Sequence, residues 1–287
     1  MVNLTINGQP ITVPKGTTII EAARQNNITI PNLCYVKDVH KVGVCRLCVV
    51  KIEGYKSLQA ACIAVATEGM VVWTNTAQIR KIRKTLYELM LSDHSHDCIG
   101  CTRNQNCEFQ AMGQMLGVET SRFEGERSSF HVDASASVTR DMTKCIRCRR
   151  CVTVCDNIQG VGVLGPQNRG FDTEIEPSNG LPLGIVNCSF CGQCTVLCPV
   201  GALRGTRGSH LAWDALGDKE LRTVVQVAPA VRVTLGELFG MPAGTKVTGK
   251  IATALRRIGF DDVFDTNFAA DLTIMEEGTE LLARLKD

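Results

Sequence analysis

The sequence contains no run of about 18 consecutive apolar residues, which is the least that a membrane-crossing helix requires. Its first eight residues alternate apolar and polar side chains and lack a charged segment followed by an apolar one, so we expect no signal peptide. An excess of one charge is also missing, because 31 Lys and Arg oppose 29 Asp and Glu. A net charge of +2 disfavours a nucleic-acid partner. These absences favour a protein of the reducing cytoplasm.

Cysteine is absent after Cys198, although the 287 residues include 15 cysteines, all between Cys34 and Cys198. Every one of them falls into a group at metal-ligand spacing, which leaves none for a disulfide or a lone catalytic thiol. In a reducing compartment, such cysteines serve metals or catalysis more often than disulfides. Thiolate sulfur suits iron–sulfur clusters or zinc. The pattern therefore predicts an electron carrier built from small, metal-braced modules, followed by a C-terminal part held by packing.

The amino terminus predicts a β-grasp beginning. Apolar and polar residues alternate over residues 4–6 and 11–13 on either side of Asn7-Gly8, a strong hairpin signal. Thr18 and Glu21 have capping-box spacing ahead of an apolar helix that should end near Asn26. A Cys-bearing loop and a strand over residues 48–52 follow.

The first group of cysteines has the pattern C-x10-C-x2-C-x13-C. The short pair and the distal fourth residue match a plant-type cluster, although the first gap is longer than usual. Only one Cys-x2-Cys pair is present, whereas structural zinc favours two. We interpret the group as a [2Fe–2S] site, with zinc as the alternative; its expected ligands are Cys34, Cys45, Cys48 and Cys62.

The second group combines one histidine with three cysteines. Residues 76–91 predict a helix with an apolar stripe of Ile79, Ile82, Leu86, Leu89 and Met90 and a basic opposite face. The pattern H-x3-C-x2-C-x5-C follows its end, and it fits either a cluster or a Cys3His zinc site. His96 is a rival ligand, while His40, His131 and His210 lack ligand spacing. The expected ligands are His94, Cys98, Cys101 and Cys107.

The third and fourth groups repeat the run C-x2-C-x2-C-x3-C, the second time followed by Pro199. In bacterial two-cluster ferredoxins, three cysteines of each run hold one [4Fe–4S] cube and the fourth ligates the other cube. Zinc has little use for three cysteines at successive x2 gaps. Asp156 stands where the first run would carry proline, which changes the turn but not the ligands. The expected sets are Cys145, Cys148, Cys151 with Cys198, and Cys188, Cys191, Cys194 with Cys155.

Three arginines lie among the first of these runs: Arg147, Arg149 and Arg150. They are candidates for offsetting negative cluster charge or for docking a partner. A solvated basic surface is the simpler interpretation, and we take it as the default.

The order of these modules resembles the amino-terminal half of the large subunit of cytoplasmic, NAD(P)-linked iron-only hydrogenases of the electron-bifurcating type found in anaerobes. It resembles more distantly the iron–sulfur subunit of respiratory complex I. The resemblance rests on the four cysteine groups, on Leu91-Ser92-Asp93-His94, and on residues 144–151, 188–199, 222–232 and 270–278. It implies that the histidine group holds a [4Fe–4S] cluster. One departure is Gln105, where the family carries glycine; Asn104 or Asn106 is expected to supply the left-handed turn instead.

Motifs and resemblance together predict an α+β multidomain chain. We expect a β-grasp [2Fe–2S] domain over residues 1–78, a helical His/Cys3 module over 79–138, a two-[4Fe–4S] ferredoxin-like domain over 139–210, and a partial α/β hydrogenase-like domain over 211–287. The family's active-site cysteines have no counterpart after Cys198. The cofactors are then one [2Fe–2S] and three [4Fe–4S] clusters, with no catalytic centre on this chain.

Two functional hypotheses follow. The first is an electron-relay subunit of an oxidoreductase complex, whose implied partners are a flavin- and NAD(P)-binding subunit, a small [2Fe–2S] subunit, a hydrogen-activating subunit and ferredoxin. The second is an amino-terminal fragment of an iron-only hydrogenase; a stop codon after Asp287 would favour the first, and a continuing reading frame the second. A nonredox zinc scaffold is the weakest hypothesis.

Overall fold

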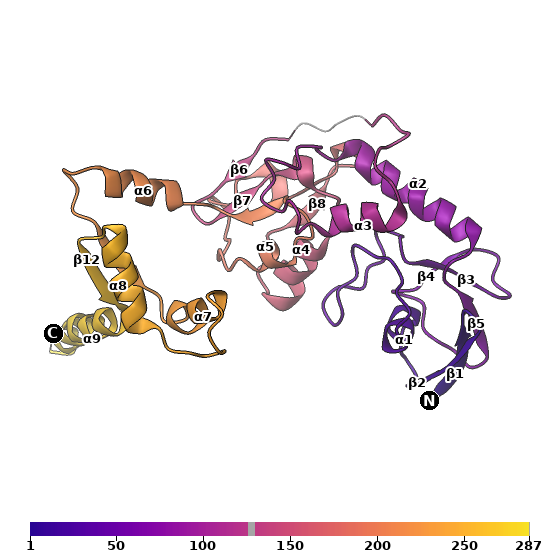
Figure 1. Ribbon diagram of the computed structural model, residues 1–287, viewed down its shortest axis with the longest axis horizontal. Coiled ribbons are helices and arrows are strands. Elements are labelled where there is room, and N and C mark those ends of the chain that lie inside the picture. The colour runs from indigo at the N-terminus through magenta and orange to yellow at the C-terminus, as the bar shows by residue number, and fades with distance from the viewer. Residues whose placement is uncertain (126–129, 287) are drawn as a thin grey trace. The chain divides into compact units, whose positions relative to one another are not determined.

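The computed structural model describes residues 1–125 and 130–286, so the expected domains 79–138 and 211–287 lie partly outside the described residues. The chain separates into two compact units, Met1–Thr206 and Arg207–Asp287. The first unit contains every cysteine and combines a mixed sheet with helices and short strands (Figure 1). The expectation of a mixed α and β architecture with ferredoxin-like parts is confirmed at this level.

A five-stranded sheet forms the amino-terminal part, in the order β2-β1-β5-β3-β4. The predicted hairpin is present, because β1 and β2 pair antiparallel through Asn7 and Gly8, which have φ angles of 52° and 83°. Both residues occupy the left-handed region, as a tight turn of this twist requires. β1 also pairs in parallel with β5, and β3 lies antiparallel to β5. The strands are β1 (Val2–Ile6), β2 (Gln9–Val13), β3 (Val49–Ile52), β4 (Gln59–Ala60) and β5 (Met70–Trp73).

Helix α1 (Ile19–Gln25) packs its buried residues into the core of this sheet and ends at Asn26, as predicted. The predicted capping-box hydrogen bonds are not formed. Thr18 is the N-cap residue, but its hydroxyl makes no cap bond and is buried without a partner. Glu21 instead accepts a hydrogen bond of 2.7 Å from the Tyr35 hydroxyl and one of 2.9 Å from Arg24. Tyr35, in the loop that follows the helix, thus binds the Glu21 carboxylate that the capping box would have used.

Helix α2 (Ala77–Asp93) begins at Thr76, whose hydroxyl accepts a hydrogen bond from the amide of Ile79. The predicted apolar stripe is correct at Ile79, which is buried, and wrong at Leu89, which is 47% exposed. Arg83 is buried on the inner face, although the pattern placed basic residues outside. After a loop, α3 (Glu108–Leu116) begins directly after Cys107 and packs against α2. The histidine group therefore lies between two helices.

The ferredoxin-like part is built from short elements, as its cysteine and glycine content suggests. A three-stranded antiparallel sheet has the order β10-β7-β6, and β8 pairs antiparallel with β9. Cys155 lies in a π-helical turn that directly continues α4. The elements are β6 (Asp133–Ala134), β7 (Val138–Arg140), η1 (Met142–Lys144), α4 (Arg150–Thr153), η2 (Val154–Ile158), β8 (Gly165–Gln167), η3 (Gly170–Asp172), β9 (Glu174–Glu176), η4 (Ser178–Gly180), α5 (Gln193–Leu197) and β10 (Leu203–Gly205).

One hydrophobic core joins the three cysteine-bearing parts of the first unit. It contains Leu33 and Leu47 from the amino-terminal loops, Phe109 from α3, and Val200 from the ferredoxin-like part. Because these parts bury apolar surface against one another, they form one compact body rather than separate domains joined by linkers.

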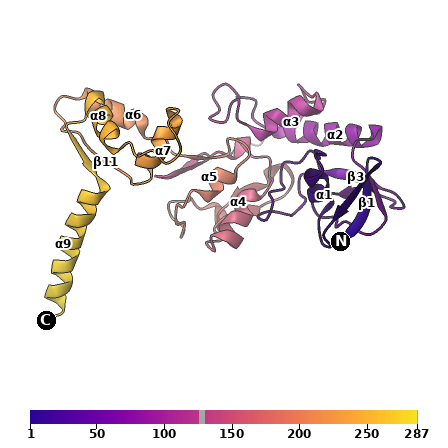
Figure 2. The same ribbon diagram turned by 60° about the horizontal axis from the view of Figure 1, so that its bottom comes forward.

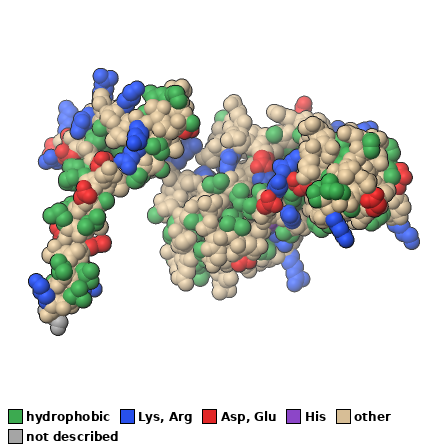
Figure 3. All heavy atoms as spheres, turned by 90° about the horizontal axis from the view of Figure 1, so that it is seen from below, with side chains coloured by type: hydrophobic (Ala, Val, Ile, Leu, Met, Phe, Trp, Pro, Cys, Tyr) green, Lys and Arg blue, Asp and Glu red, His purple; other side chains and the backbone are tan. Residues whose placement is uncertain are grey.

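The second unit is small and contains a parallel pair of strands, β11 and β12. Its last helix, α9, is long, and Figure 2 shows it extending away from the other elements of this unit. Apolar and charged side chains alternate along this helix (Figure 3), and Leu272, Ile274 and Met275 are at least half exposed. The elements are α6 (Ser209–Gly217), β11 (Val224–Val227), α7 (Val231–Leu238), α8 (Thr248–Ile258), β12 (Asp262–Asp265) and α9 (Thr266–Arg284).

Candidate metal centres

The four cysteines of the first group converge in the buried interior of the amino-terminal part; we call them the N-terminal site. All four are at most 8% exposed, and the sulfur atoms of Cys48 and Cys62 lie 3.4 Å apart. Hydrogen bonds from the thiols of Cys45 and Cys62 hold the pKa of the Cys34 thiol far below its ordinary value, at about 2. These contacts favour the thiolate form of Cys34, which is the form that binds metal ions.

Arg83 fixes the backbone around this site. Its Nε donates a hydrogen bond of 2.8 Å to the carbonyl oxygen of Leu47, and its Nη2 donates one of 2.9 Å to that of Val49. These residues flank Cys48. Burial lowers the pKa of Arg83 to about 10 against the opposing attraction of Cys48, so the guanidinium remains charged at neutral pH. A buried cation is therefore held beside the sulfur ligands.

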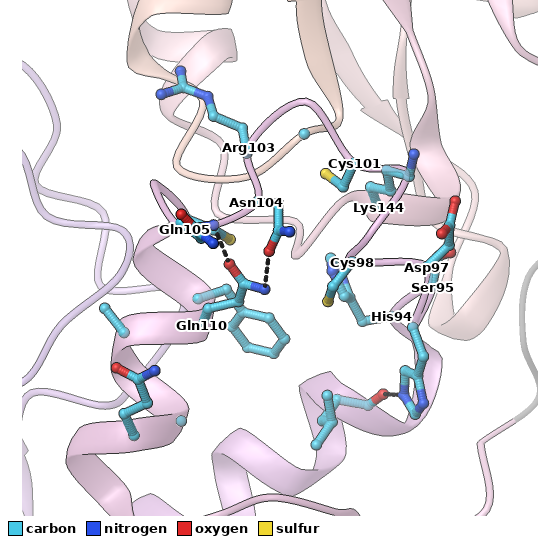
Figure 4. A pocket seen from close by; sticks show the side chains of 18 of the residues that line it. His94, Ser95, Asp97, Cys98, Cys101, Arg103, Asn104, Gln105, Gln110 and Lys144 are labelled. Atoms are coloured by element: carbon cyan, nitrogen blue, oxygen red, sulfur yellow. Dashed lines mark hydrogen bonds between the residues drawn. The ribbon is translucent and has the colours of Figure 1, made fainter.

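The histidine group lines a cavity of about 690 Å³ between α2, α3 and the turn after Cys198; we call it the histidine site. Cys98 and Cys101 point their sulfur atoms into this cavity (Figure 4). The His94 ring lies 4.9 Å, centroid to centroid, from the ring of Phe109. Cys98 and Cys101 both contribute to raising the pKa of Cys107, after burial, so the three sulfurs share one electrostatic environment.

His94 fits a ligand role better than its rival His96. The His94 ring is 9% exposed, and its Nδ1 is buried without a hydrogen-bond partner. Burial, followed by the nearby His96 and Lys144, lowers its pKa to about 4, so the imidazole is neutral at pH 7 and can donate a lone pair. The Nε2 of His96 lies 3.1 Å from the carbonyl oxygen of Leu91. That contact occupies one nitrogen of the exposed His96 ring.

The turn before Cys107 differs from the prediction. Gln105 itself takes the left-handed conformation with a φ of 64°, whereas we expected Asn104 or Asn106 to do so. Its amide donates a hydrogen bond of 3.1 Å to Oε1 of Gln110, and Nε2 of Gln110 donates to Asn104 at 3.2 Å (Figure 4). The Gln110 side chain thus bridges the loop and replaces the conformational freedom that glycine would give.

Cys145, Cys148, Cys151 and Cys198 gather in the ferredoxin-like part and form the inner paired site. Burial raises the pKa of the Cys151 thiol, and the other three sulfurs raise it further. Cys198 comes from the second run and interacts with the first three cysteines, as crossed ligation requires. The amide of Arg147 donates a hydrogen bond of 3.3 Å to the Cys145 sulfur. Such a bond stabilises negative charge on sulfur.

The other four cysteines of the two runs form the outer paired site, which is closer to solvent. Burial raises the pKa of Cys194 to about 11, and its neighbours Cys188, Cys191 and Cys155 act in the same direction. Cys155 comes from the first run and so completes the crossed pattern. Cys191 is exposed, whereas the inner paired site has no exposed cysteine.

Side chains of the histidine site also hold the inner paired site. Arg103, from the loop between Cys101 and Cys107, donates hydrogen bonds of 3.1 Å to the carbonyl oxygens of both Thr195 and Cys198. Gly201 lies so close to the histidine site that a Cβ atom there would be 2.5 Å from the Cys101 sulfur. The two sites are therefore in close packing contact.

The three arginines of the first run have three different environments. Arg149 is exposed, in agreement with the solvated interpretation. Arg147 forms an ion pair with Asp93 and donates hydrogen bonds to the carbonyl oxygens of Thr173 and Phe171. Arg150 is only 6% exposed. The prediction of a solvated basic surface was therefore wrong for Arg150, because an ion pair with Glu108 compensates for its burial.

The donor sets fit iron–sulfur clusters in composition, burial and mutual electrostatics. Within residues 1–125 and 130–286, no group of three His, Cys, Asp or Glu side chains is arranged to hold a single metal ion. The buried thiols of raised pKa must lose protons when they bind metal, so metal loading should release protons.

Sequence reasoning found the ligand candidates but missed the residues that hold them. Arg83 looked like part of a basic helix face, and no spacing signal pointed to Arg103. Glu108 had one usable signal, since an acidic residue directly after Cys107 stands in the first turn of a helix. Gly201 had no signal, because the sequence does not show what approaches it.

Four family models match consecutive parts of the chain. They describe a 2Fe-2S iron–sulfur cluster binding domain (residues 1–77), an NADH-ubiquinone oxidoreductase-G iron–sulfur binding region (83–122), a ferredoxin-like domain of NADH-quinone oxidoreductase subunit 3 (135–204), and the C-terminal domain of the iron-only hydrogenase large subunit (221–287).

Several known proteins are similar over most of the chain. The NADP-reducing hydrogenase subunit HndD of Solidesulfovibrio fructosivorans is 46% identical over 99% of this chain and 50% of its own length. Iron hydrogenase 1 of Clostridium pasteurianum is 36% identical over 100% of this chain and 50% of its own. The NADH-ubiquinone oxidoreductase 75 kDa subunit of Reclinomonas americana is 35% identical over 71% of this chain and 29% of its own length.

A crystal structure of an NAD+-reducing [NiFe]-hydrogenase in the H2-reduced state contains a similar chain. The TM-score is 0.67 at 29% sequence identity, covering 72% of this chain and 88% of that one. The chain spans about half the length of the two hydrogenase relatives. None of the helices in the described residues has the length and apolar character needed to cross a bilayer.

Proposed function

Since this chain belongs to the iron–sulfur family that includes the large subunits of NAD(P)-linked hydrogenases and the 75 kDa subunits of NADH-ubiquinone oxidoreductase, we propose that it is the electron relay of such an assembly. The observation that carries the proposal is the use of its cysteines. All fifteen collect with His94 in four groups, and each group has cysteines within or against one shared core. No cysteine is left for another chemistry.

The proposed ligand sets follow the four sites. The N-terminal site holds a [2Fe–2S] cluster, and the histidine site and the two paired sites hold [4Fe–4S] clusters. Supporting the crossed assignment, Cys198 shares the electrostatic environment of the first run and Cys155 that of the second. We also propose that the chain is an α+β protein of four modules in order, with the boundaries 1–78, 79–138, 139–210 and 211–287.

When bound, the clusters supply one-electron carriers whose potentials depend on ligand type, hydrogen bonds to sulfur and burial. The chain's own residues set those conditions. The Arg147 amide donates to sulfur, Arg83 places a cation beside the N-terminal site, and His94 offers a neutral ligand in place of a thiolate. A neutral ligand removes one negative charge from the site, which favours reduction.

The proposed partners are a flavin- and NAD(P)-binding subunit, a small [2Fe–2S] subunit, a hydrogen-activating subunit and ferredoxin, in the cytoplasm of an anaerobe with electron bifurcation. The hydrogenase relatives named above support an NAD(P)-linked setting. Cys191 is exposed, so the outer paired site is the one open to a partner that exchanges electrons directly. The N-terminal site is buried by comparison.

A second candidate function is supported by the match of residues 221–287 to the hydrogenase C-terminal domain and by the twofold greater length of the hydrogenase relatives. In this case the polypeptide is the amino-terminal portion of an iron-only hydrogenase. Both candidates assign the same clusters, and both predict that this polypeptide alone does not turn over hydrogen.

The test of the relay is electron transfer by the purified, anaerobically reconstituted chain. We expect the dithionite-reduced chain, after removal of excess dithionite, to reduce added ferredoxin stoichiometrically, while it evolves no hydrogen. Hydrogen evolution by the chain alone would contradict both candidates. A chain that takes up no electrons from dithionite would contradict the relay.

A further inference from the structure

Arg150 is a buried arginine within the first run of paired-site cysteines, and the inference drawn from it rests on the proposed relay function. It is the first residue of α4 and only 6% exposed. Its Nη1 and Nη2 donate hydrogen bonds of 2.7 Å each to Oε1 and Oε2 of Glu108. This bidentate geometry is the strongest arrangement that an arginine and a carboxylate form.

The surroundings of Arg150 come from three sites. Arg150 lies between Cys148 and Cys151 in the sequence, and Cys34, Cys148 and Cys151 belong to one buried core. Cys148 belongs to the inner paired site and Cys34 to the N-terminal site. Glu108 follows Cys107 of the histidine site directly in the chain. The positive charge of Arg150 thus lies near residues of three sites.

A second contact joins the N-terminal site to the same helix, α4. His40, from the loop after Cys34, is fully buried, and its Nδ1 lies 2.6 Å from the hydroxyl of Thr153 in α4. The loop of the N-terminal site is therefore fastened to the helix that begins with Arg150. The His40 contact thus joins the N-terminal site to the inner paired site, and the Arg150–Glu108 pair joins the inner paired site to the histidine site.

The charges of the ion pair are unequally screened. The side chain of Arg150 is 7% exposed, whereas that of Glu108 is 51% exposed. Solvent weakens the field of an exposed charge much more than that of a buried one. The positive charge therefore dominates at the neighbouring sulfurs, although the pair is formally neutral.

We propose that Arg150 is a positioning residue that favours the reduced state of the N-terminal and inner paired clusters and, through Glu108, holds the inner paired site against the histidine site. An electron that enters a cluster adds one negative charge, and a nearby buried cation stabilises that charge. We expect the effect to be selective, because the exposed Cys191 opens the outer paired site to solvent, which screens the charge.

The test is an EPR-monitored redox titration of the full, anaerobically reconstituted chain carrying Arg150→Gln. We expect wild-type iron content, and midpoint potentials lower by at least about 59 mV at the N-terminal and inner paired clusters. That shift corresponds to a tenfold fall in the ratio of reduced to oxidised cluster for one electron. The outer paired cluster serves as the internal reference and should keep its potential.

Arg149→Gln is the matched control, because it removes the same charge from the adjacent, exposed position. It should leave all potentials unchanged. A second variant, Glu108→Gln, removes the partner carboxylate and should shift the same two potentials in the opposite direction. This variant keeps the inference testable if Arg150→Gln fails to fold, and Arg150→Lys, which retains the charge, should preserve the potentials better than Arg150→Gln.

Unchanged potentials in both Arg150→Gln and Glu108→Gln, or an equal shift in Arg149→Gln, would overturn the inference while the relay function stands. If Arg150→Gln does not fold, an unchanged or lowered potential in Glu108→Gln overturns it. A wild-type chain that contains none of these clusters contradicts the proposed function itself, and the inference falls with it.

Discussion

Arg103 donates a hydrogen bond of 3.1 Å to the carbonyl oxygen of Cys198 and so links two cluster sites through the protein backbone. Arg103 lies in the loop of the histidine site, and Cys198 completes the inner paired site. The attraction of Arg103 also lowers the pKa of Cys198, although burial dominates and raises it. The histidine site and the inner paired site are therefore connected by a hydrogen bond and by electrostatic attraction.

Replacing Gly201 by alanine should disrupt the histidine site. The added Cβ would lie 2.5 Å from the sulfur of Cys101, closer than real contacts allow, so the ligand must move. We expect the loss of about four iron atoms per chain, the content of one cube. Iron analysis and EPR of the reduced chain measure this loss.

Gly205→Ala in β10 is the control for that substitution, since a Cβ there meets its nearest atom only at 4.0 Å. It should retain the full iron content. If Gly201→Ala kept all its iron and an unaltered EPR spectrum, the close packing of Gly201 against the histidine site would be refuted.

Replacing Arg83 by methionine should destabilise the N-terminal site. The carbonyl oxygens of Leu47 and Val49 would lose their donors in a buried environment. Each buried group left unpaired costs about 1–3 kcal/mol, so for two groups we expect a loss of roughly 2–6 kcal/mol in the free energy of unfolding. Denaturant unfolding, followed through the [2Fe–2S] absorbance, checks this value.

Arg80→Met provides the comparison, because Arg80 is an exposed arginine one turn earlier on α2. It should cost less than about 0.5 kcal/mol, as surface substitutions usually do. Equal stability of the two variants would show that Arg83 does not hold the Cys48 loop.

Replacing Cys155 by serine should affect the outer paired cluster, although Cys155 belongs to the first cysteine run. The reason is the proposed crossed ligation, in which the fourth cysteine of each run ligates the other cube. In EPR spectra we expect the outer paired signal to change and the inner one to persist. The reverse result would mean that each run holds its own cube.

Glu176→Gln should change the pH dependence of stability. Burial, with the repulsion of Glu174, raises the pKa of Glu176 above its ordinary value of 4.5, despite the attraction of Arg140. A carboxyl with a raised pKa in the folded state favours folding at low pH, and this contribution is lost as the pH rises through the folded pKa. The ionised Glu176 therefore costs stability at neutral pH.

The variant should accordingly gain thermal stability relative to wild type at pH 7 and lose that advantage below pH 4.5. Arg140 keeps ion pairs with Asp133 and Glu174 in the variant, so the local structure should persist. Thermal unfolding at a series of pH values compares the two chains. A difference in Tm that does not vary with pH would refute the raised pKa.

The sequence was a good guide where local rules decide structure. Asn7-Gly8 predicted its hairpin because only a few residues accept two successive left-handed conformations. Cysteine spacing named the ligand candidates because a cluster demands particular separations. The same rules failed at Thr18, where a distant tyrosine took the capping partner Glu21, and at Gln105, where a side chain five residues away stabilised the turn.

Residues that act between modules were not predictable in this way. The roles of Arg83, Arg103 and Arg150 depend on carbonyl and carboxylate groups brought close only by folding. A buried arginine and a solvated one look alike in a sequence. The difference lies in the partner, and the partner lies dozens of residues away.

Anaerobic iron and acid-labile sulfide analysis, combined with EPR of the dithionite-reduced full chain, tests the central claim most directly. We expect about 14 iron atoms per chain, with signals from one [2Fe–2S] and three [4Fe–4S] clusters. A correctly folded, colourless chain that carries zinc in place of iron would contradict the account.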